Sequence, residues 1–329
     1  MRRCFLAAGL ALLLAAAPLA ALGQADTLTL ATLNCEFLTR PRVHVKFGLP
    51  FDLSDAPQAD RQQWAQPGFR DARFAEAAQA VAQVLAGLDA DVLALTEVGD
   101  DADVAELQQA LNALGAVYPH RAVGTSRDTF TRQHVAVLSR FPLTNLIAEI
   151  PGRESFIEEP DDPETEDDTG ISKGMRVTVQ AHGRALLLYV VHLASERGGY
   201  EQDQQRIAQA SILRRHYLPA LRADSLVAVA GDLNDKPGQP TLLRLRGLDD
   251  IDADLIQTGH ARYFDDDALD TRFTYIFQGV RQQIDHILLS PAIDAATLRG
   301  GIQARTVDHG NALATDHRAL VVLLRLRRP

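Results

Sequence analysis

The stretch Val227-Ala228-Val229-Ala230-Gly231-Asp232-Leu233-Asn234-Asp235 guides the interpretation of the whole sequence. It opens as an apolar run with Val at alternate positions, which is typical of a strand buried on both faces. It closes in Gly-Asp-Leu-Asn, and the Asp-Lys-Pro-Gly that follows is turn chemistry. The stretch therefore predicts a core strand that delivers Asp232 and Asn234, on one face, to its carboxyl end. Taken alone, such a pair is more typical of a capped turn than of a functional site.

The first residues of the chain have a character of their own. Arg2 and Arg3 precede an apolar run from about Cys4 to Leu22, and small residues follow up to Ala25. This pattern predicts a secretory signal peptide over residues 1–25, export to the periplasm or the extracellular space, and one domain over 26–329. A retained membrane anchor is the alternative, because the run is near the length that spans a bilayer. We expect no stable membrane insertion of the rest, since no later stretch approaches that length.

Composition sets further bounds. The chain has 329 residues, of which 46% are hydrophobic and 23% charged, as in ordinary globular proteins. Cys4 would leave with the signal peptide, so Cys35 has no partner for an intrachain disulfide and is predicted to be a buried, inert thiol. Without Arg2 and Arg3, 31 basic residues face 43 acidic ones. This negative balance argues against avid binding of long polyanions, but it does not exclude a nuclease that holds its substrate weakly.

Alternating and helical patterns divide the rest into strands and helices. Strands are predicted at 27–34, 91–98, 135–140, 175–181, 185–191, 227–232, 273–277, 284–290 and 319–324, and helices at 69–88, 101–114 and 204–221. Four prolines between 39 and 69 predict an irregular insertion, either a surface flap or a disordered linker. Nine acidic and no basic residues between 154 and 168 predict a solvated loop. That loop either borders the site and repels polyanions or is remote from it.

Polar residues gather at the ends of the predicted strands. They are Asn34, Glu36, Glu97, His192, Asp232, Asn234, Asp285, Asp316 and His317. Carboxylate and amide oxygens of this kind suit Mg²⁺, Mn²⁺ or Ca²⁺ rather than structural zinc. A metal ion together with two histidines and a carboxylate suits hydrolysis of a phosphate ester, because the metal neutralises phosphoryl charge while a base aligns water.

Six short motifs in order resemble one known family. They are Asn34 with Glu36, Thr96-Glu97, Val191-His192-Leu193, Gly231-Asp232-Leu233-Asn234, Ile284-Asp285-His286 and Thr315-Asp316-His317. Together, from about residue 27 to 324, they resemble the endonuclease/exonuclease/phosphatase family with the deoxyribonuclease-I-like fold. The resemblance implies an α/β (α+β) fold, a four-layer sandwich of two packed mixed β-sheets flanked by helices. It also implies hydrolysis of phosphodiesters or phosphomonoesters with a divalent metal, Mg²⁺ or Mn²⁺.

The resemblance also implies a role for each motif residue. Glu97 is similar to the principal metal ligand of the family, and Asn34, Glu36 and Asp316 to further ligands. Asp232 matches the aspartate that orients or deprotonates water, and Asn234 its neighbour on the phosphate. His192 and His317 match the histidines on the phosphoryl oxygens, and Asp285 the carboxylate that orients His317. Because a neighbouring carboxylate favours the cation, we expect His317 to be a phosphate clamp or an acid.

Some residues depart from the family pattern or compete with it. Thr315 stands where Ser is common, and Ala319 and Leu320 stand where Pro and Val are common. A second Asp-His pair, Asp308-His309, is interpreted as a surface feature, and His134 is a less favoured candidate for the site. Basic residues on loops that can lie near the site are Arg40, Arg42, Lys46, Arg127, Arg132, Lys173, Arg176 and Arg197.

The leading functional prediction is an exported, divalent-metal-dependent phosphodiesterase, most similar to a nuclease. Its expected partner is a phosphate-ester substrate, including nucleic acid, with no obligate protein partner. A phosphomonoesterase and a lipid phosphodiesterase of the sphingomyelinase type are alternatives on the same fold, because fold does not select the substrate. A non-catalytic binding protein is the alternative from another class, and the complete set of candidate residues argues against it.

Overall fold

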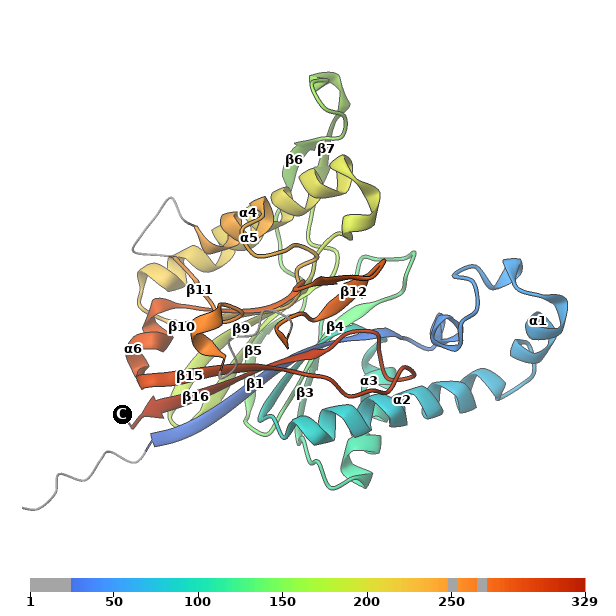
Figure 1. The fold of residues 1–329 in the computed structure, drawn as a ribbon, viewed down its shortest axis with the longest axis horizontal. Coiled ribbons are helices and arrows are strands. Elements are labelled where there is room, and N and C mark those ends of the chain that lie inside the picture. The colour runs from blue at the N-terminus through green and yellow to red at the C-terminus, as the bar shows by residue number, and fades with distance from the viewer. Residues whose placement is uncertain (1–24, 248–253, 265–270, 329) are drawn as a thin grey trace, which may run out of the picture.

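The computed structural model describes residues 25–247, 254–264 and 271–328. The predicted signal peptide thus lies outside the described residues, except for Ala25. Two six-stranded sheets pack face to face, and helices cover both outer faces, so that four layers lie one above another (Figure 1). This is the sandwich that the sequence predicted. Within the described residues, no helix has the length and apolar character needed to cross a membrane.

The first sheet has the order β15-β16-β1-β2-β4-β3. Its strands are β1 (Ala25–Leu38), β2 (Val92–Val98), β3 (His120–Val123), β4 (His134–Ser139), β15 (Thr297–Val307) and β16 (Ala319–Arg327). The neighbours β1 and β2 are parallel, whereas the other pairs of this sheet are antiparallel.

The second sheet has the order β11-β14-β10-β9-β8-β5. Its strands are β5 (Leu143–Ile147), β8 (Gly174–Ala181), β9 (Arg184–His192), β10 (Leu226–Asp232), β11 (Ile256–Gln257) and β14 (Asp285–Leu289). The neighbours β9 and β10 are parallel, and the remaining pairs are antiparallel. Both sheets are therefore mixed, as expected.

Helices surround the two sheets. They are α1 (Gln58–Trp64), α2 (Phe69–Leu88), α3 (Asp101–Ala113), α4 (Tyr200–Arg222), α5 (Pro240–Arg246) and α6 (Pro291–Ala296). α2 and α3 cover the first sheet, and α4 and α5 cover the second. The strand that opened the sequence argument explains this layering. Val227 and Val229 pack in the cluster with α4, whereas Ala228 and Ala230 pack in the cluster between the sheets. A strand buried on both faces must be apolar at every position.

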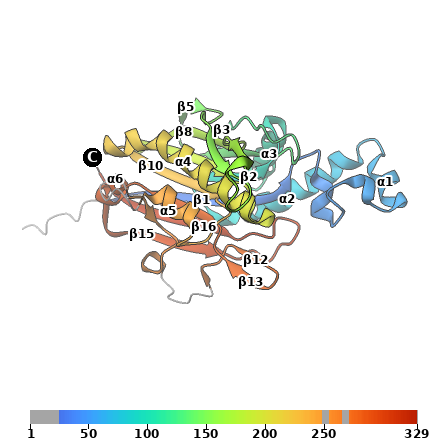
Figure 2. The ribbon, with the colours of Figure 1, turned by 90° about the horizontal axis from the view of Figure 1, so that it is seen from above.

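The insertion at 39–69 is more regular than predicted. It contains two short 3-10 helices, η1 (Val43–Phe47) and η2 (Leu53–Asp55), as well as α1. The prolines mark boundaries rather than disorder, since Pro57 directly precedes α1. The segment that carries α1 extends beyond one end of the sandwich, as a surface flap does (Figures 1 and 2).

The acidic segment is also not a plain loop. β6 (Glu154–Ile157) and β7 (Glu166–Thr169) pair as an antiparallel hairpin, which packs against α4 and projects from the sandwich (Figure 1). Its charges are partly compensated, because Glu154 pairs with Arg215 and Asp168 with Arg153. Acidic composition correctly indicated exposure, but it did not reveal these cross-strand and helix contacts.

Candidate active site

The carboxyl ends of the two parallel strand pairs meet at one edge of the sandwich. β1 packs against β10, and β2 against β9, across the interface between the sheets. In the first sheet Asn34 lies opposite Thr96. In the second sheet Asp232 lies opposite His192 on one side and Asp285 on the other. Strand register alone therefore places three of the predicted residues on adjacent strands.

A bulge in β1 shapes the first wall of the site. The register between β1 and β2 shifts between Asn34 and Leu38, and two of the three residues between them have positive φ, 43° at Glu36 and 48° at Phe37. Glu97 has a φ of 56°. Positive φ is uncommon for residues with a side chain and tends to persist at functional sites. Here it lets the backbone N–H of Phe37 donate to Oε2 of Glu97 at 2.9 Å.

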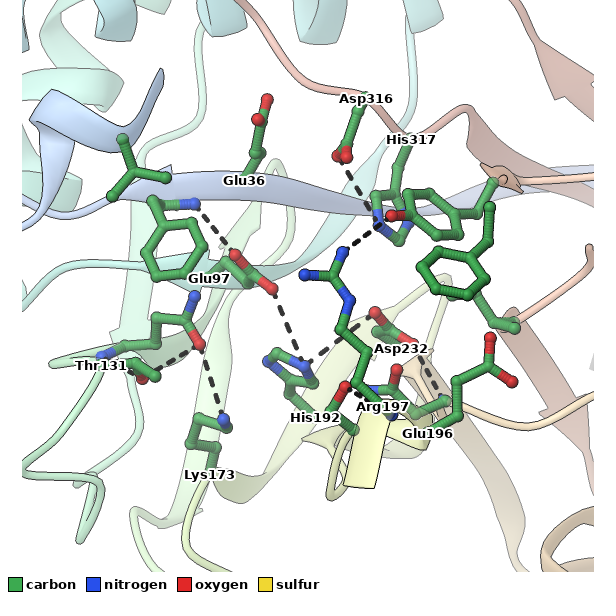
Figure 3. A pocket seen from close by; sticks show the side chains of 18 residues that line it. Glu36, Glu97, Thr131, Lys173, His192, Glu196, Arg197, Asp232, Asp316 and His317 are labelled. Carbon is green, nitrogen blue, oxygen red and sulfur yellow. Dashed lines mark hydrogen bonds and ion pairs between the residues drawn. The ribbon is translucent and has the colours of Figure 1, made fainter. Parts of the chain in front are cut away.

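Asn34 joins the two sheets within the site. Its Nδ2 donates to Oε1 of Glu97 at 3.1 Å and to Oδ2 of Asp232 at 2.9 Å. Asp232 also accepts the backbone N–H of Asn234 at its other oxygen, at 2.9 Å. His192 faces both carboxylates, with Nε2 at 3.8 Å from Glu97 and 3.9 Å from Asp232 (Figure 3). The amide therefore fixes the relative position of two carboxylates that would otherwise repel each other.

His317 completes the opposite wall. Its Nδ1 lies 2.7 Å from Oδ2 of Asp285, and its Nε2 lies 3.8 Å from Oδ1 of Asp316. The ring of Tyr275 stacks on the imidazole with centroids 4.5 Å apart. Thr315 holds the segment, because its hydroxyl donates to the carbonyl of Asn34 at 2.7 Å and accepts the N–H of His317 at 3.0 Å. The hydroxyl that Thr shares with Ser is the group that this position uses.

These walls enclose a cavity of about 290 Å³. Seven of the nine predicted residues line it: Glu36, Glu97, His192, Asp232, Asn234, Asp316 and His317. Asn34 and Asp285 lie directly behind, each bonded to a lining residue. The structure thus brings all nine together. Lys173 and Arg197 also line the cavity, so two of the eight basic candidates lie at its surface (Figure 3).

Burial and neighbouring charges separate the pKa values of the titrating groups in the site. The pKa of Asp232 is raised to about 7, first by burial and then by the Asp285 charge. Burial would lower the pKa of His317, but the charge and hydrogen bond of Asp285 outweigh it and raise that pKa to about 10. Burial lowers the pKa of His192 well below its ordinary value. His317 is therefore cationic, as expected, and His192 neutral at pH 7.

Glu36 has an unusual pKa for a carboxyl group. Burial raises it to about 7, against the opposing charge of Lys46 and with the help of Asp316 and Glu97. Carboxylates that raise one another's pKa are a common feature of functional sites. A cation among them would relieve this repulsion.

Of two further histidines considered from the sequence, one differs from its interpretation. His309 is not merely a surface residue, since its Nε2 bonds the carbonyl of His317 at 2.9 Å. His134 bonds the carbonyl of Gly124 and does not line the cavity. Cys35 is confirmed as a buried thiol, and burial raises its pKa to about 12.

Phe37, Tyr275 and Phe277 form an aromatic side of the cavity that was not predicted from the sequence. Tyr275 and Phe277 lie two apart on β12 (Tyr275–Phe277), which forms a hairpin with β13 (Val280–Gln282). Their alternation was visible in the sequence, but the partner that they face was not.

Comparison with known proteins decides the family. A family model described as the Endonuclease/Exonuclease/phosphatase family matches residues 31–317. The chain belongs to this family. Its members are metal-dependent phosphoester hydrolases, and this protein is an enzyme of that class. A sequence comparison with curated proteins found no match.

Solved structures of the family share the fold at low identity. Truncated TDP2 of Caenorhabditis elegans is 15% identical, with a TM-score of 0.52 over 91% of this chain and 97% of that one. A beta toxin variant of Staphylococcus aureus with bound magnesium ions is 13% identical, with a TM-score of 0.56 over 90% and 99%. A family member from Beutenbergia cavernae is 21% identical, with a TM-score of 0.52 over 91% and 72%.

The donor set of this family member fits a divalent cation. Glu36, Glu97 and Asp316 present carboxylates to one cavity, and such hard oxygen ligands suit Mg²⁺ and Mn²⁺. Asp232, Asp285 and His317 also have ligand atoms within 4.8 Å of one another.

Proposed function

We propose that this protein is an exported, nuclease-like phosphodiesterase that uses Mg²⁺ or Mn²⁺. The single observation that carries the proposal is the placement of Asp232 between Asn34 and His192, in a cavity that also holds a cationic His317. A carboxylate with a pKa of about 7 is suited to accept a proton near neutral pH. A buried imidazolium opposite it is suited to hold an anionic phosphoryl group.

Each wall has its own task in this proposal. Glu97, Glu36, Asp316 and the amide of Asn34 would hold the metal, which would neutralise phosphoryl charge when bound. Asp232 orients the attacking water and takes its proton, while Asn234 supports the phosphate. His192, being neutral, donates one hydrogen bond to a phosphoryl oxygen. His317, held by Asp285, offers the Nε2–H as a clamp or as the acid for the leaving oxygen.

The cation count favours a diester. Of the described Lys and Arg side chains that line the cavity, Lys173 is paired with Asp128 at 3.1 Å. Arg197 instead donates to the hydroxyl of Tyr275 at 3.0 Å and has no carboxylate partner among the described residues. Besides the metal and His317, Arg197 is thus the one basic side chain of the described cavity lining that is free of a carboxylate partner, which suits the single charge of a phosphodiester. A phosphomonoester carries about −1.5 to −2 at neutral pH and would need more.

A row of aromatic side chains, Phe37, Phe51 and Phe130, leads away from the cavity and supports nucleic acid as the substrate. We call this row the aromatic path. Phe37 lines the cavity and contacts Phe51 edge-on at 5.9 Å, and Phe51 stacks on Phe130 at 4.6 Å. Arg42 lies over Phe51 and donates to the carbonyls of Phe51 and Phe130. Phe130 is still 68% exposed. Aromatic faces that lead out of a phosphate site suit stacked bases.

A lipid phosphodiester is the second candidate. On the hairpin of β12 and β13, Val280 is 60% and Ile276 50% exposed, and Val280 pairs with the cavity-lining Phe277. Exposed apolar residues beside a phosphate site are also what a lipid substrate requires.

A substrate panel tests the proposal. The protein from residue 26 is assayed with Mg²⁺ and with Mn²⁺ on single-stranded DNA, plasmid DNA, RNA, a nitrophenyl phosphodiester, the matching monoester and sphingomyelin vesicles. We expect diesters to be cleaved and nucleic acid to be preferred. A monoester or sphingomyelin turned over ten times faster than every nucleic acid contradicts the proposal.

The aromatic path has a matched pair of variants. Phe130→Ala should raise the Michaelis constant for single-stranded DNA about tenfold, and Phe130→Leu nearly as much, because both remove a stacking face. Neither should affect the small diester. If only sphingomyelin hydrolysis falls, and Leu restores it, the surface contacts lipid.

We further infer export from the charged start and apolar run before Ala25. Mass spectrometry of the exported protein should give a first residue near Gln24 or Asp26, and an intact Met1 contradicts the inference.

A further inference from the structure

Lys46 is a buried cation beneath the metal wall, the part of the cavity lining that presents the predicted ligands Glu36, Glu97 and Asp316. It lies on η1 within the insertion, and its side chain is 0% exposed. Its Nζ donates to three backbone carbonyls, those of Cys35 at 2.9 Å, Glu36 at 2.8 Å and Ala314 at 2.8 Å. The Glu36 carboxylate lies 3.7 Å away. All three hydrogen positions of an ammonium group are therefore used on main-chain acceptors.

This geometry matches the ammonium form of Lys46. A neutral amine has two N–H bonds and a lone pair, so one of the three carbonyls would face that lone pair. Three acceptors at hydrogen-bond distance match the three N–H bonds of the ammonium form, while burial lowers the pKa of Lys46 against the opposing charge of Glu36. Lysine is rare in this chain, with 3 lysines among its 33 basic residues, so its use at this position is informative. A compact ammonium is the group that fits three converging carbonyls, whereas the planar guanidinium of Arg does not.

The contacts of Lys46 explain the bulge in β1. Successive carbonyls of a strand normally point to opposite sides. Those of Cys35 and Glu36 both point to Lys46, and two of the residues at the bulge take positive φ. This conformation turns the Glu36 side chain into the cavity and sends the N–H of Phe37 to Glu97. The ammonium group of Lys46 thus determines the backbone conformation between the predicted metal ligands Asn34 and Glu36.

The third carbonyl connects a distant part of the chain. Ala314 is 268 residues from Lys46 and two before Asp316. The segments that carry Glu36 and Asp316 are thus tied to one buried group. The flap holds that group in place, since Trp64 at the end of α1 packs on His44 and Phe47 at either side of Lys46, with ring centroids 5.9 and 5.8 Å apart.

We propose that Lys46 is a positioning residue that assembles the metal wall, and that the insertion at 39–69 exists in this chain to carry it. Lys46 holds the backbone at Glu36 and Ala314 so that the carboxylates of Glu36 and Asp316 face the same cavity as Glu97. The proposal depends on the metal site and not on the choice of substrate.

Calorimetry without substrate tests this role. Lys46→Met keeps the length of the side chain and removes the charge and the donors. We expect the folded variant to bind Mg²⁺ at least tenfold more weakly, and its hydrolysis to recover partly at high Mg²⁺. Lys236→Met, which removes a half-buried lysine paired with Glu196, is the matched control and should bind Mg²⁺ as the wild type does. Wild-type Mg²⁺ affinity in folded Lys46→Met overturns the proposal.

A second test keeps Lys46 in place and so does not depend on the folding of a Lys46 variant. With ¹⁵N-lysine labelling the wild-type protein contains three ammonium groups, and Lys173→Arg and Lys236→Arg identify the remaining signal. We expect the Lys46 ammonium to exchange slowly with water at pH 7 and its signal to shift when Mg²⁺ is added. A fast-exchanging group excludes the carbonyl cradle, and a signal indifferent to Mg²⁺ leaves Lys46 a purely structural residue; either result overturns the proposal. Neither result would bear on whether the substrate is nucleic acid.

Discussion

Nδ1 of His317 lies 2.7 Å from Oδ2 of Asp285, and both side chains are buried at the wall of the cavity. Asp285 starts β14, whereas His317 precedes β16 in the other sheet. The pair therefore spans the sandwich at the site. This contact outweighs burial and gives His317 a pKa of about 10.

The pH dependence of hydrolysis should follow from this pair. If catalysis needs the His317 cation, the rate falls on the alkaline side as the pH rises through about 10. Asp285→Asn removes the charge that raises this pKa, so the alkaline limb of kcat/KM should move to lower pH by more than a unit. Asp308→Asn, in the second Asp-His pair, should leave the limb in place. An unmoved limb in Asp285→Asn means that another group titrates there.

Asp232→Asn should lower kcat by about two to three orders of magnitude, the scale of a lost general base. The substitution is isosteric, so the melting temperature should change little. Asp235→Asn is the control, because that carboxylate accepts backbone N–H groups at Lys236 and Thr241 and does not line the cavity. Equal losses in the two variants would indicate a folding effect instead of a catalytic one.

Metal dependence should be complete. A chelator should abolish hydrolysis, and Mg²⁺ or Mn²⁺ should restore it. Glu97→Gln should raise the Mg²⁺ concentration for half-maximal rate by about tenfold or more, because a neutral amide is a weaker ligand for a hard cation. Glu106→Gln, at a surface carboxylate bonded to Arg40, should not. Activity that persists in excess chelator is incompatible with the assigned site.

His286 should make the fold sensitive to acid. Burial lowers its pKa below the ordinary 6.5, and its Nε2 bonds the carbonyl of Asp235. The unfolded chain then binds the proton more readily, so this residue contributes stability above pH 6.5 that is lost as the pH falls. The destabilisation caused by His286→Gln should therefore be smaller at pH 5.5 than at 7.5 in urea unfolding. For the exposed His260→Gln, the difference should not depend on pH in this way.

The acidic hairpin should not select the substrate. No residue of the described segment 154–168 lines the cavity, and the hairpin packs against α4. Neutralising Glu158, Glu159, Asp161 and Asp162 should change the Michaelis constants for DNA and for a small diester by the same factor, within about twofold, across a salt series. A selective gain for DNA would restore the idea of an electrostatic gate.

Local sequence determined the elements that carry the site. Asp232 and Asn234 follow an apolar run, and Glu97 ends another, so the strand ends and their polar residues were predictable from periodicity. The order of six motifs supplied the family and hence the sandwich. The helix at 69–88 was predicted with the bounds that α2 has, because its apolar stripe is long and uninterrupted.

Some elements depended on partners that the local sequence does not contain. β15 was missed, because Gly300, Gly301 and charged residues mask its alternation, and it is a strand only through pairing with β16. The hairpin of β6 and β7 was hidden by its acidic composition. In both cases a neighbouring element provides the hydrogen bonds that the composition argues against.

The tertiary structure alone decided the finer constitution of the site. Eight basic residues were equal candidates in the sequence, yet Arg197 and Lys173 line the cavity and Lys46 lies beneath it, with contacts to residues 11 and 268 positions away. Tyr275 became part of the site by stacking on His317, whereas His309 lies outside the cavity lining and bonds the carbonyl of His317. Periodicity reports which face of a strand or helix is buried. It contains no information about which distant side chain meets that face, because that depends on how the two sheets pack.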